Sequence, residues 1–178
     1  MSVYKGLITG IESHGGSPTY TAITDRVQKV IDESGIKSGL CCVIAPHTTC
    51  SVFTDETVHD ILPNGDEFLM ADLNNIMDKI VPPQVAWGQY FYPGQQHFDS
   101  FWHWPDEEVE KWLPGRDKTM LWNCDAHLRA TMIGASEMYE VEDGKLCISS
   151  NGMGHVYFVD WDRTRVRQRN CKVIIIGE

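Results

Sequence analysis

The last third of the chain is a close series of strand-like segments, and this pattern limits the fold more than any other feature. The segments are 138–141, 146–149, 155–161 and 166–176. Asp143-Gly144 separates the first two, and Asp-Gly is a preferred pair for a two-residue hairpin turn. We therefore expect a β-meander here. An earlier apolar run, Gly39 to Ala45, is bounded by turn formers and predicts a further strand that is covered on both sides.

Two amphipathic helices are predicted in the first half of the chain. Ser17-Pro18 provides a cap and a first-turn proline, and Gly35 provides a stop. The apolar stripe between them consists of Tyr20, Ile23, Val27, Val30 and Ile31. The second helix covers about Glu67 to Ile80, and its expected buried face consists of Leu69, Leu73, Ile76, Met77 and Ile80. These elements predict an α+β fold in one domain, residues 1–178, with antiparallel sheets packed on each other and on two main helices.

Residues 84–121 form an aromatic-rich insertion or extended loop. Its aromatic side chains are too dense for a disordered segment. Three interpretations remain open, namely a lid over a site, a contact between subunits, and a satellite core under a long excursion. The packing and contact interpretations are favoured over the lid.

Composition excludes some partners. The net charge of −10 argues against a nucleic-acid or anionic membrane partner. No stretch approaches the roughly 20 apolar residues that cross a bilayer, and the N-terminus lacks a signal-peptide pattern. The six cysteines form no Cys-x-x-Cys pair. We expect a cytoplasmic protein with reduced thiols.

One basic cluster stands out in this acidic chain. Arginine recurs at every second position, at Arg163, Arg165, Arg167 and Arg169, which predicts that the four side chains share one face of a strand. The favoured interpretation is a solvated strand face or a contact to an acidic neighbouring subunit. The alternative is a patch that binds phosphate or a small anionic substrate.

The first candidate site residue is His47, which follows the apolar run that ends at Ala45. Pro46 disfavours helix and holds His47 at an extended corner. Thr48 and Thr49 offer hydroxyls to a substrate oxygen or to the imidazole itself. A strand-end histidine that bonds a backbone carbonyl is an equally good interpretation of the local sequence.

The second candidate is His127, which opens a helix-like segment. Asp125 either caps this helix or orients the imidazole, and Asn123 is placed to hold a polar group of a substrate. Arg129 follows two residues later and is the nearest cation of the segment. If the His47 and His127 segments meet in space, they form a site for a metal ion or for acid/base chemistry.

A carboxylate completes a possible ligand set. Asp55 and Glu56 follow the first histidine motif, and one of them faces inward if the strand continues. Two histidines with one carboxylate would suit zinc or a similar divalent ion. Acidic side chains exposed to water in a loop are an equally good interpretation.

Taken together, these segments resemble the YjbQ family, whose members are named as secondary thiamine-phosphate synthase enzymes. The likeness rests on Pro46-His47-Thr48-Thr49, Asn123-Cys124-Asp125-Ala126-His127-Leu128-Arg129-Ala130, Ile133-Gly134-Ala135-Ser136, Val141-Glu142-Asp143-Gly144-Lys145-Leu146 and the C-terminal Val173-Ile174-Ile175-Ile176-Gly177-Glu178. Their order agrees with the family throughout most of the chain. Glu56 matches the acidic residue that follows the first motif in the family.

The resemblance implies a YjbQ-like antiparallel β-sandwich and a homotrimer. It also implies a single pocket lined by His47, Thr48, Thr49, Glu56, Asn123, Asp125 and His127. Two features depart from the family. The Gly-Thr-Trp-Gln stretch after the hairpin is replaced here by residues 149–155, where Asn151 or His155 is a candidate substitute for the glutamine. The extra histidine that often precedes the second motif would be His97 or His103.

These observations predict an enzyme that acts on a small-molecule substrate by metal-assisted hydrolysis or group transfer. His47 and His127 are expected to be metal ligands or catalytic acid/base groups, with Glu56 or Asp125 as third ligand or orienting group. The expected substrate-binding residues are Thr48, Thr49, Asn123 and Arg129. The expected cofactor is a divalent metal, Zn²⁺ or Mg²⁺, and the resemblance adds a side activity as a thiamine-phosphate synthase. The alternative function is a non-enzymatic trimeric module that binds a metabolite or a metal.

Overall fold

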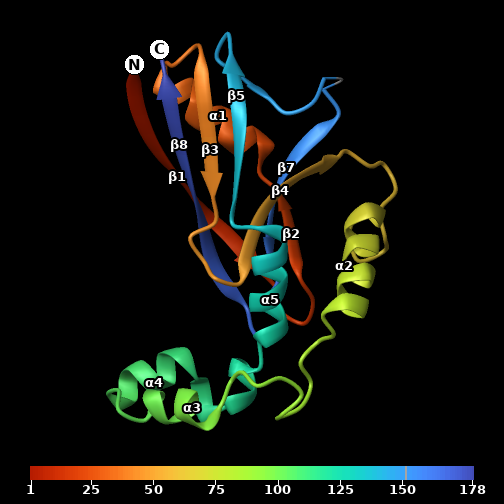
Figure 1. Ribbon diagram of the computed structural model, residues 1–178, viewed down its shortest axis with the longest axis vertical. Coiled ribbons are helices and arrows are strands. Elements are labelled where there is room, and N and C mark those ends of the chain that lie inside the picture. Colours follow the sequence, from red (N-terminus) through yellow and green to blue (C-terminus); the bar gives the residue numbers. More distant parts are fainter. Residues whose placement is uncertain (151) are drawn as a thin grey trace.

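The computed structural model describes residues 1–150 and 152–178, and it contains two antiparallel sheets (Figure 1). The strands are β1 (Ser2–Ser13), β2 (Thr19–Ala22), β3 (Gly39–Ile44), β4 (Cys50–Glu56), β5 (Ser136–Glu142), β6 (Lys145–Cys147), β7 (Gly154–Asp160) and β8 (Arg167–Gly177). The larger sheet has the order β1-β8-β3-β5-β6 and the smaller one β2-β7-β4.

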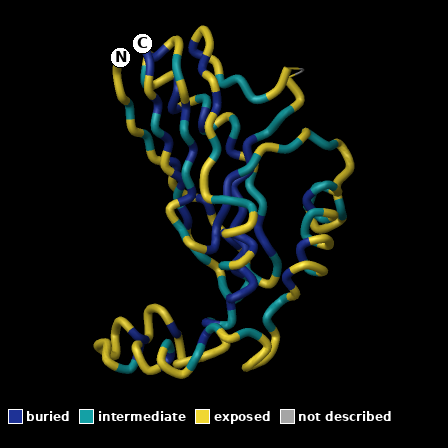
Figure 2. Tube along the Cα trace, in the orientation of Figure 1, coloured by how far each residue is buried: buried dark blue, intermediate teal, exposed yellow. Residues whose placement is uncertain are grey.

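Three of the helices pack on the sheets and two lie apart from them. The helices are α1 (Thr24–Ser34), α2 (Phe68–Ile80), α3 (Gln95–Phe101), α4 (Asp106–Trp112) and α5 (Cys124–Ile133), with short 3-10 turns η1 (Pro114–Arg116) and η2 (Lys118–Leu121). The main core lies between α1 and the inner faces of both sheets, where Figure 2 shows the buried stretches concentrated. A second core joins α2 and α5 to the smaller sheet through Met77, Ala126 and Trp161. The predicted α+β fold is therefore confirmed, with more helices than the two expected.

The hairpin prediction is confirmed. β5 pairs with β6, and the turn residues Asp143 and Gly144 have φ angles of 50° and 74°. Positive φ at both central positions is what the tight hairpin turn requires. The expected meander is wrong, because β7 joins the other sheet and β8 inserts between β1 and β3. The N-terminal strand β1 was not expected from the sequence.

Two further element predictions need correction. The first helix begins at Thr24, because residues 19–22 pair with β7 as strand β2 instead of continuing the helical stripe. Its C-terminal stop is as predicted, with Gly35 at φ 69°. β3 is covered on one face only, since its residues alternate between buried and accessible and Leu40 is half exposed. In α2, Met70 and Met77 are buried, whereas Ile76 and Ile80 of the expected buried face are exposed.

The aromatic-rich residues 84–121 contain α3, α4, η1 and η2. They build a satellite core from Phe98, Phe101, Leu113 and Leu121. Figure 1 places α3 and α4 at the end of the molecule opposite the two termini. No helix within the described residues is long and apolar enough to cross a membrane.

Candidate functional site

The first histidine lies in a turn that passes from one sheet to the other. β3 ends at Ile44 and β4 begins at Cys50, and the Cys50 amide donates to the His47 carbonyl at 3.0 Å. The His47 Nε2 accepts a hydrogen bond from the amide of Asn170 in β8 at 3.2 Å. A neutral imidazole that accepts at Nε2 carries its proton on Nδ1. His47 is thereby set up as a hydrogen-bond donor through Nδ1.

The second histidine lies in the first turn of α5, which packs against β4. The Thr48 backbone raises the pKa of the His127 imidazole and so acts against the lowering caused by burial. The Tyr92 ring stands edge-on to His127, with the ring centroids 5.5 Å apart.

His47, Thr48 and His127 line one cavity of about 440 Å³. Its other lining residues are Cys50, Ala130, Thr131, Gly134 and Ala135. The structure thus brings the two histidine segments together although 80 positions separate them in the chain. Cys50 is no nucleophile here, because burial and the Asp160 carboxylate raise the pKa of its thiol far above the ordinary value.

The surroundings of both imidazoles lower their pKa and so favour the neutral form. Burial lowers the pKa of His47 below its ordinary value of 6.5, and the Arg169 guanidinium acts in the same direction. Burial also lowers the pKa of His127, although the Asp162 carboxylate opposes this. His97 adds to the lowering at His127 and accepts or donates a 3.0 Å hydrogen bond at the Tyr92 hydroxyl. Of the two extra histidine candidates, it is therefore His97 that lies near the site, while His103 is exposed.

A buried ion pair between Arg169 and Asp160 stabilises the turn that contains His47. Arg169 binds Asp160 through two contacts, Nε to Oδ2 at 2.7 Å and Nη2 to Oδ1 at 3.0 Å. The same Nη2 donates to the Thr49 hydroxyl at 3.0 Å, and the Trp161 amide donates to the Thr49 carbonyl at 3.0 Å. Thr49 was expected to bind substrate, yet it is buried and its hydroxyl is engaged in this support.

Asn123 and Asp125 lie at a neighbouring cavity of about 260 Å³, which they line together with Gly16, Pro83, Gln84, Val85, Thr119, Trp122, Arg163 and Thr164. The Asn123 Nδ2 donates to Asp162 at 3.1 Å. Asp125 is not the cap of α5, because Asn123 occupies that position. Its carboxylate instead accepts from Arg163 at 2.5 Å.

Two other expected site residues lie away from the histidines. Arg129 has a fully buried side chain, which binds Asp78 of α2 at 2.5 Å and the Val81 carbonyl at 2.7 Å. Glu56 ends β4, six residues beyond Cys50, so about 20 Å of extended strand separates it from the histidine turn. Of the proposed glutamine substitutes, His155 bonds Thr24 at 3.0 Å, and Asn151 lies outside the described residues.

The described residues assemble no three-ligand metal centre around the two histidines. Within residues 1–150 and 152–178 there is no group of three or more His, Cys, Asp or Glu side chains arranged to hold a metal ion. Asp125 is committed to Arg163 and Glu56 is distant. Metal binding by His47 and His127 stays a prediction.

The arginine row is not a solvated strand face. Arg163 and Arg165 precede β8, and each of the four side chains has a partner in the chain: Asp125 for Arg163, the Trp112 carbonyl for Arg165, Asp162 for Arg167 and Asp160 for Arg169. Arg169 supports the site, and Asp160 and Asp162 were missed by sequence reasoning. The sequence did contain a sign of these ion pairs. Asp160 and Asp162 directly precede the arginines and, like them, recur at every second position, so that opposite charges can pair.

The fold and the site together define a single-domain α+β protein with a small-molecule-sized cavity lined by two neutral histidines. The family model for "UPF0047 protein YjbQ-like" matches residues 11–178, and the chain belongs to this YjbQ/UPF0047 family. Among curated relatives, a UPF0047 protein of Archaeoglobus fulgidus is 28% identical over 154 residues, which cover 85% of this chain and 88% of the relative. YugU of Bacillus subtilis is 24% identical, covering 87% of each chain.

Solved structures agree with the fold. A YbjQ-like protein of unknown function from Sulfolobus solfataricus has a TM-score of 0.68 at 24% identity and covers 99% of both chains. An uncharacterised conserved protein from Clostridium acetobutylicum has a TM-score of 0.63, also at 24% identity, and covers 99% of this chain and 100% of its own. These similarities establish the fold class, and the relatives are themselves without an assigned function.

Proposed function

We propose that this chain is a small-molecule enzyme in which His47 and His127 act as an acid/base pair in hydrolysis or group transfer. One observation carries the proposal: two imidazoles from distant parts of the chain, both with pKa lowered by burial, line a single cavity. A pair that is neutral at neutral pH can both accept and donate protons, as general acid–base catalysis requires.

The two rings have different roles in this proposal. In its neutral form His127 takes a proton from water or from a substrate hydroxyl through the ring nitrogen that carries none. His47 accepts from Asn170 at Nε2, so Nδ1–H donates to a substrate oxygen as negative charge develops on it. The Thr48 hydroxyl of the same cavity supplies a further hydrogen bond to the substrate. The Thr131 hydroxyl donates to the His127 carbonyl at 2.9 Å, so it can only accept from a substrate.

Two finer expectations stay predictions. The thiamine-phosphate synthase side activity rests on the family resemblance alone. A metal-assisted form of the reaction needs a third ligand beyond His47 and His127. About one zinc or magnesium ion per chain in untagged protein would support this form. The non-enzymatic binding module is the alternative against which the enzyme is tested.

The proposal is tested with activated esters that report acid/base chemistry without knowledge of the natural substrate. Hydrolysis of p-nitrophenyl acetate and p-nitrophenyl phosphate is measured for the wild type and for His47→Gln, His127→Gln and the control His59→Gln, which changes an exposed histidine. We expect either site variant to lose at least about 100-fold of the wild-type rate, the usual contribution of one acid or base, and the control to keep it.

Full activity in both site variants would contradict the proposal, as would an equal loss in His59→Gln. A wild type that hydrolyses neither ester, while it still binds small molecules, would replace the enzyme with the binding module.

A further inference from the structure

His47 also lines a second cavity, which does not include His127. Its volume is about 550 Å³, and it is lined by His47, Lys111, Trp112, Pro114, Met120, Arg165, Val166, Arg167, Gln168 and Arg169. The lining combines the start of β8 with the end of the aromatic-rich residues 84–121. Four of these side chains are cationic and none of the described lining residues is acidic, in a chain whose net charge is −10.

Two of the four cations are neutralised by buried aspartates. Arg167 binds Asp162 at 2.8 Å and Arg169 binds Asp160 at 2.7 Å. These pairs leave little net charge to attract a ligand.

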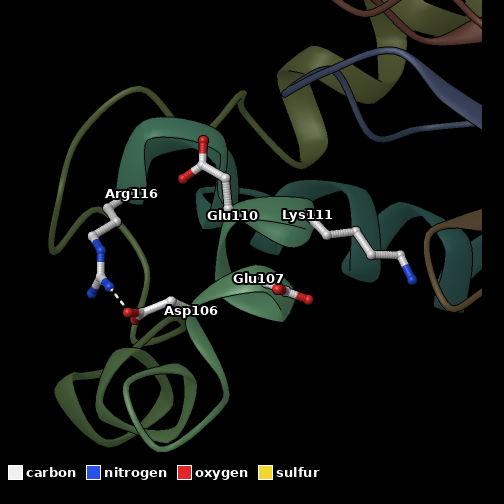
Figure 3. Close-up of a pocket in the computed structure, with 5 residues that line it drawn as sticks. All are labelled: Asp106, Glu107, Glu110, Lys111 and Arg116. Carbon is white, nitrogen blue, oxygen red and sulfur yellow. Dashed lines mark hydrogen bonds and ion pairs between the residues drawn. The ribbon is translucent and has the colours of Figure 1, made fainter.

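The other two cations are not neutralised in this way. Arg165 makes no ion pair with a carboxylate in the described part of the chain, and its contacts are the Trp112 carbonyl and the Met120 sulfur. Lys111 lies 4.0 Å from Glu108, and both side chains are more than half exposed, so that pair is weak. Lys111 also lines the neighbouring hollow that contains Glu107 and Glu110. In Figure 3 its side chain extends away from the Asp106–Arg116 ion pair of that hollow.

Arg165 is held in a partly desolvated position. Burial, with help from the Arg167 charge, lowers the pKa of Arg165 to about 10, so the guanidinium stays protonated at neutral pH. Its contacts to Trp112 and Met120 use Nη1 only. The remaining donors of its planar fork suit a carboxylate or phosphate. Trp112 and Met120 add an aromatic and a polarisable apolar wall beside that charge.

We infer that this cavity binds the anionic end of the substrate, a carboxylate or phosphate joined to a flat apolar body, with Arg165 and Lys111 on the anion and Trp112 and Met120 on the body. The inference rests on the proposed function, because His47 borders both cavities and a molecule held here presents its other end to the imidazoles. Arg165 and Lys111 bind and orient in this scheme and take no part in proton transfer.

Binding of phenyl phosphate, followed by calorimetry at low salt, tests the inference without any need for turnover. We expect saturable binding by the wild type and about 10- to 100-fold weaker binding by Arg165→Gln, the loss expected for a charge-assisted hydrogen bond. Arg116→Gln is the matched control, because this exposed arginine of η1 pairs with Asp106 outside the cavity, and it should bind as the wild type does. Benzoate distinguishes a carboxylate site from a phosphate site, and benzyl alcohol, which lacks the charge, should not bind.

Lys111→Gln provides a second variant whose folding is not in question, because the side chain is largely exposed. It should weaken phenyl phosphate binding several-fold and reduce its salt dependence. No binding by the wild type, or equal binding by Arg165→Gln and Arg116→Gln, would overturn the anion site. Either result would leave the acid/base proposal standing, since that proposal is decided by the ester hydrolysis of the histidine variants.

Discussion

Arg129 illustrates how a charged side chain near a site can serve stability alone. Its side chain is fully buried, lies 5.9 Å from the ring centre of Trp161 and binds both Asp78 and the Val81 carbonyl. These contacts join α5 to the C-terminal end of α2, which packs on the smaller sheet. The guanidinium is thus a brace between two helices on the far side of α5 from the histidine cavity.

Replacing this brace should destabilise the protein. We expect Arg129→Met to lower the free energy of unfolding by roughly 2–3 kcal/mol, somewhat less than for a fully buried pair because Asp78 is partly exposed and keeps a second contact to Arg163. Arg116→Met, which breaks an exposed pair, should cost under about 1 kcal/mol. Urea unfolding measures both, and equal midpoints for the two variants would contradict the bracing role.

The histidines also give a pH dependence with a definite sign. Burial lowers the pKa of His47, His97 and His127 in the folded state, so the unfolded chain binds more protons just below pH 6.5. Stability should therefore be constant above about pH 7 and fall as the pH drops through 6.5 toward 5. Replacing all three by Gln should reduce this fall in a urea titration, and an unchanged slope would contradict the assignment.

Local residue patterns identified the two histidines but not their surroundings. A histidine at a strand end and one in a helix's first turn are visible in the sequence, because strand and helix signals around them are strong. The neighbours of each ring depend on tertiary pairing, which aligns Cys50 with Asp160 and places Asn170 against His47. Arg129 and Asp125 looked like site residues since they are close in sequence, yet helix geometry and the partners Asp78 and Arg163 direct them elsewhere.

At the scale of elements, the contact between β3 and β8 depends on a close backbone approach. Gly39 lies opposite Gly177, and a Cβ on Gly39 would lie 2.1 Å from the Ile176 carbonyl oxygen. Because backbone atoms cannot move aside as a flexible side chain can, Gly39→Ala should cost about 3 kcal/mol or more.

Gly35→Ala is the matched comparison. Gly35 ends α1 at φ 69° with open space around it, so alanine there meets only the left-handed backbone penalty of about 1 kcal/mol. Thermal unfolding of both variants distinguishes the two effects. A Gly39→Ala protein as stable as Gly35→Ala would show that the strands separate easily at this point.

Element types were predicted well where local signals were strong, as in β3, α2 and the β5–β6 hairpin. Pairing between strands distant in the chain was not predicted, because β8 pairs with β1 across the full length of the chain and nothing local encodes that. Residues 19–22 followed a helical stripe but became β2, since pairing with β7 outweighed the local periodicity. Whether Ile76 and Ile80 are exposed likewise depends on which elements pack against α2, and the sequence of the helix alone does not give this.

At the scale of the whole molecule, the chain folds as one domain with a satellite core at one end. The homotrimer implied by the family resemblance remains a prediction. We expect sedimentation equilibrium of the untagged protein to give about three times the chain mass of 20.2 kDa at micromolar concentration. A mass of 20.2 kDa that does not change with concentration would contradict it.

Residues 84–121 form one wall of the cavity beside Arg165, because Trp112 and Met120 come from this segment and line the cavity with the start of β8. The two cavities meet at His47, one with paired imidazoles and the other with unneutralised cations. If both proposals hold, a substrate lies with its anionic end beside Arg165 and its reacting end between the two histidines.

The most direct test of the account is an NMR titration of the imidazole nitrogens of His47 and His127, first with pH and then with phenyl phosphate. We predict that both rings titrate below 6.5, because burial lowers the pKa of each, and that phenyl phosphate moves both resonances but not that of exposed His59. A pKa at or above 6.5 for either ring, or a response from only one of them, would contradict the shared acid/base site.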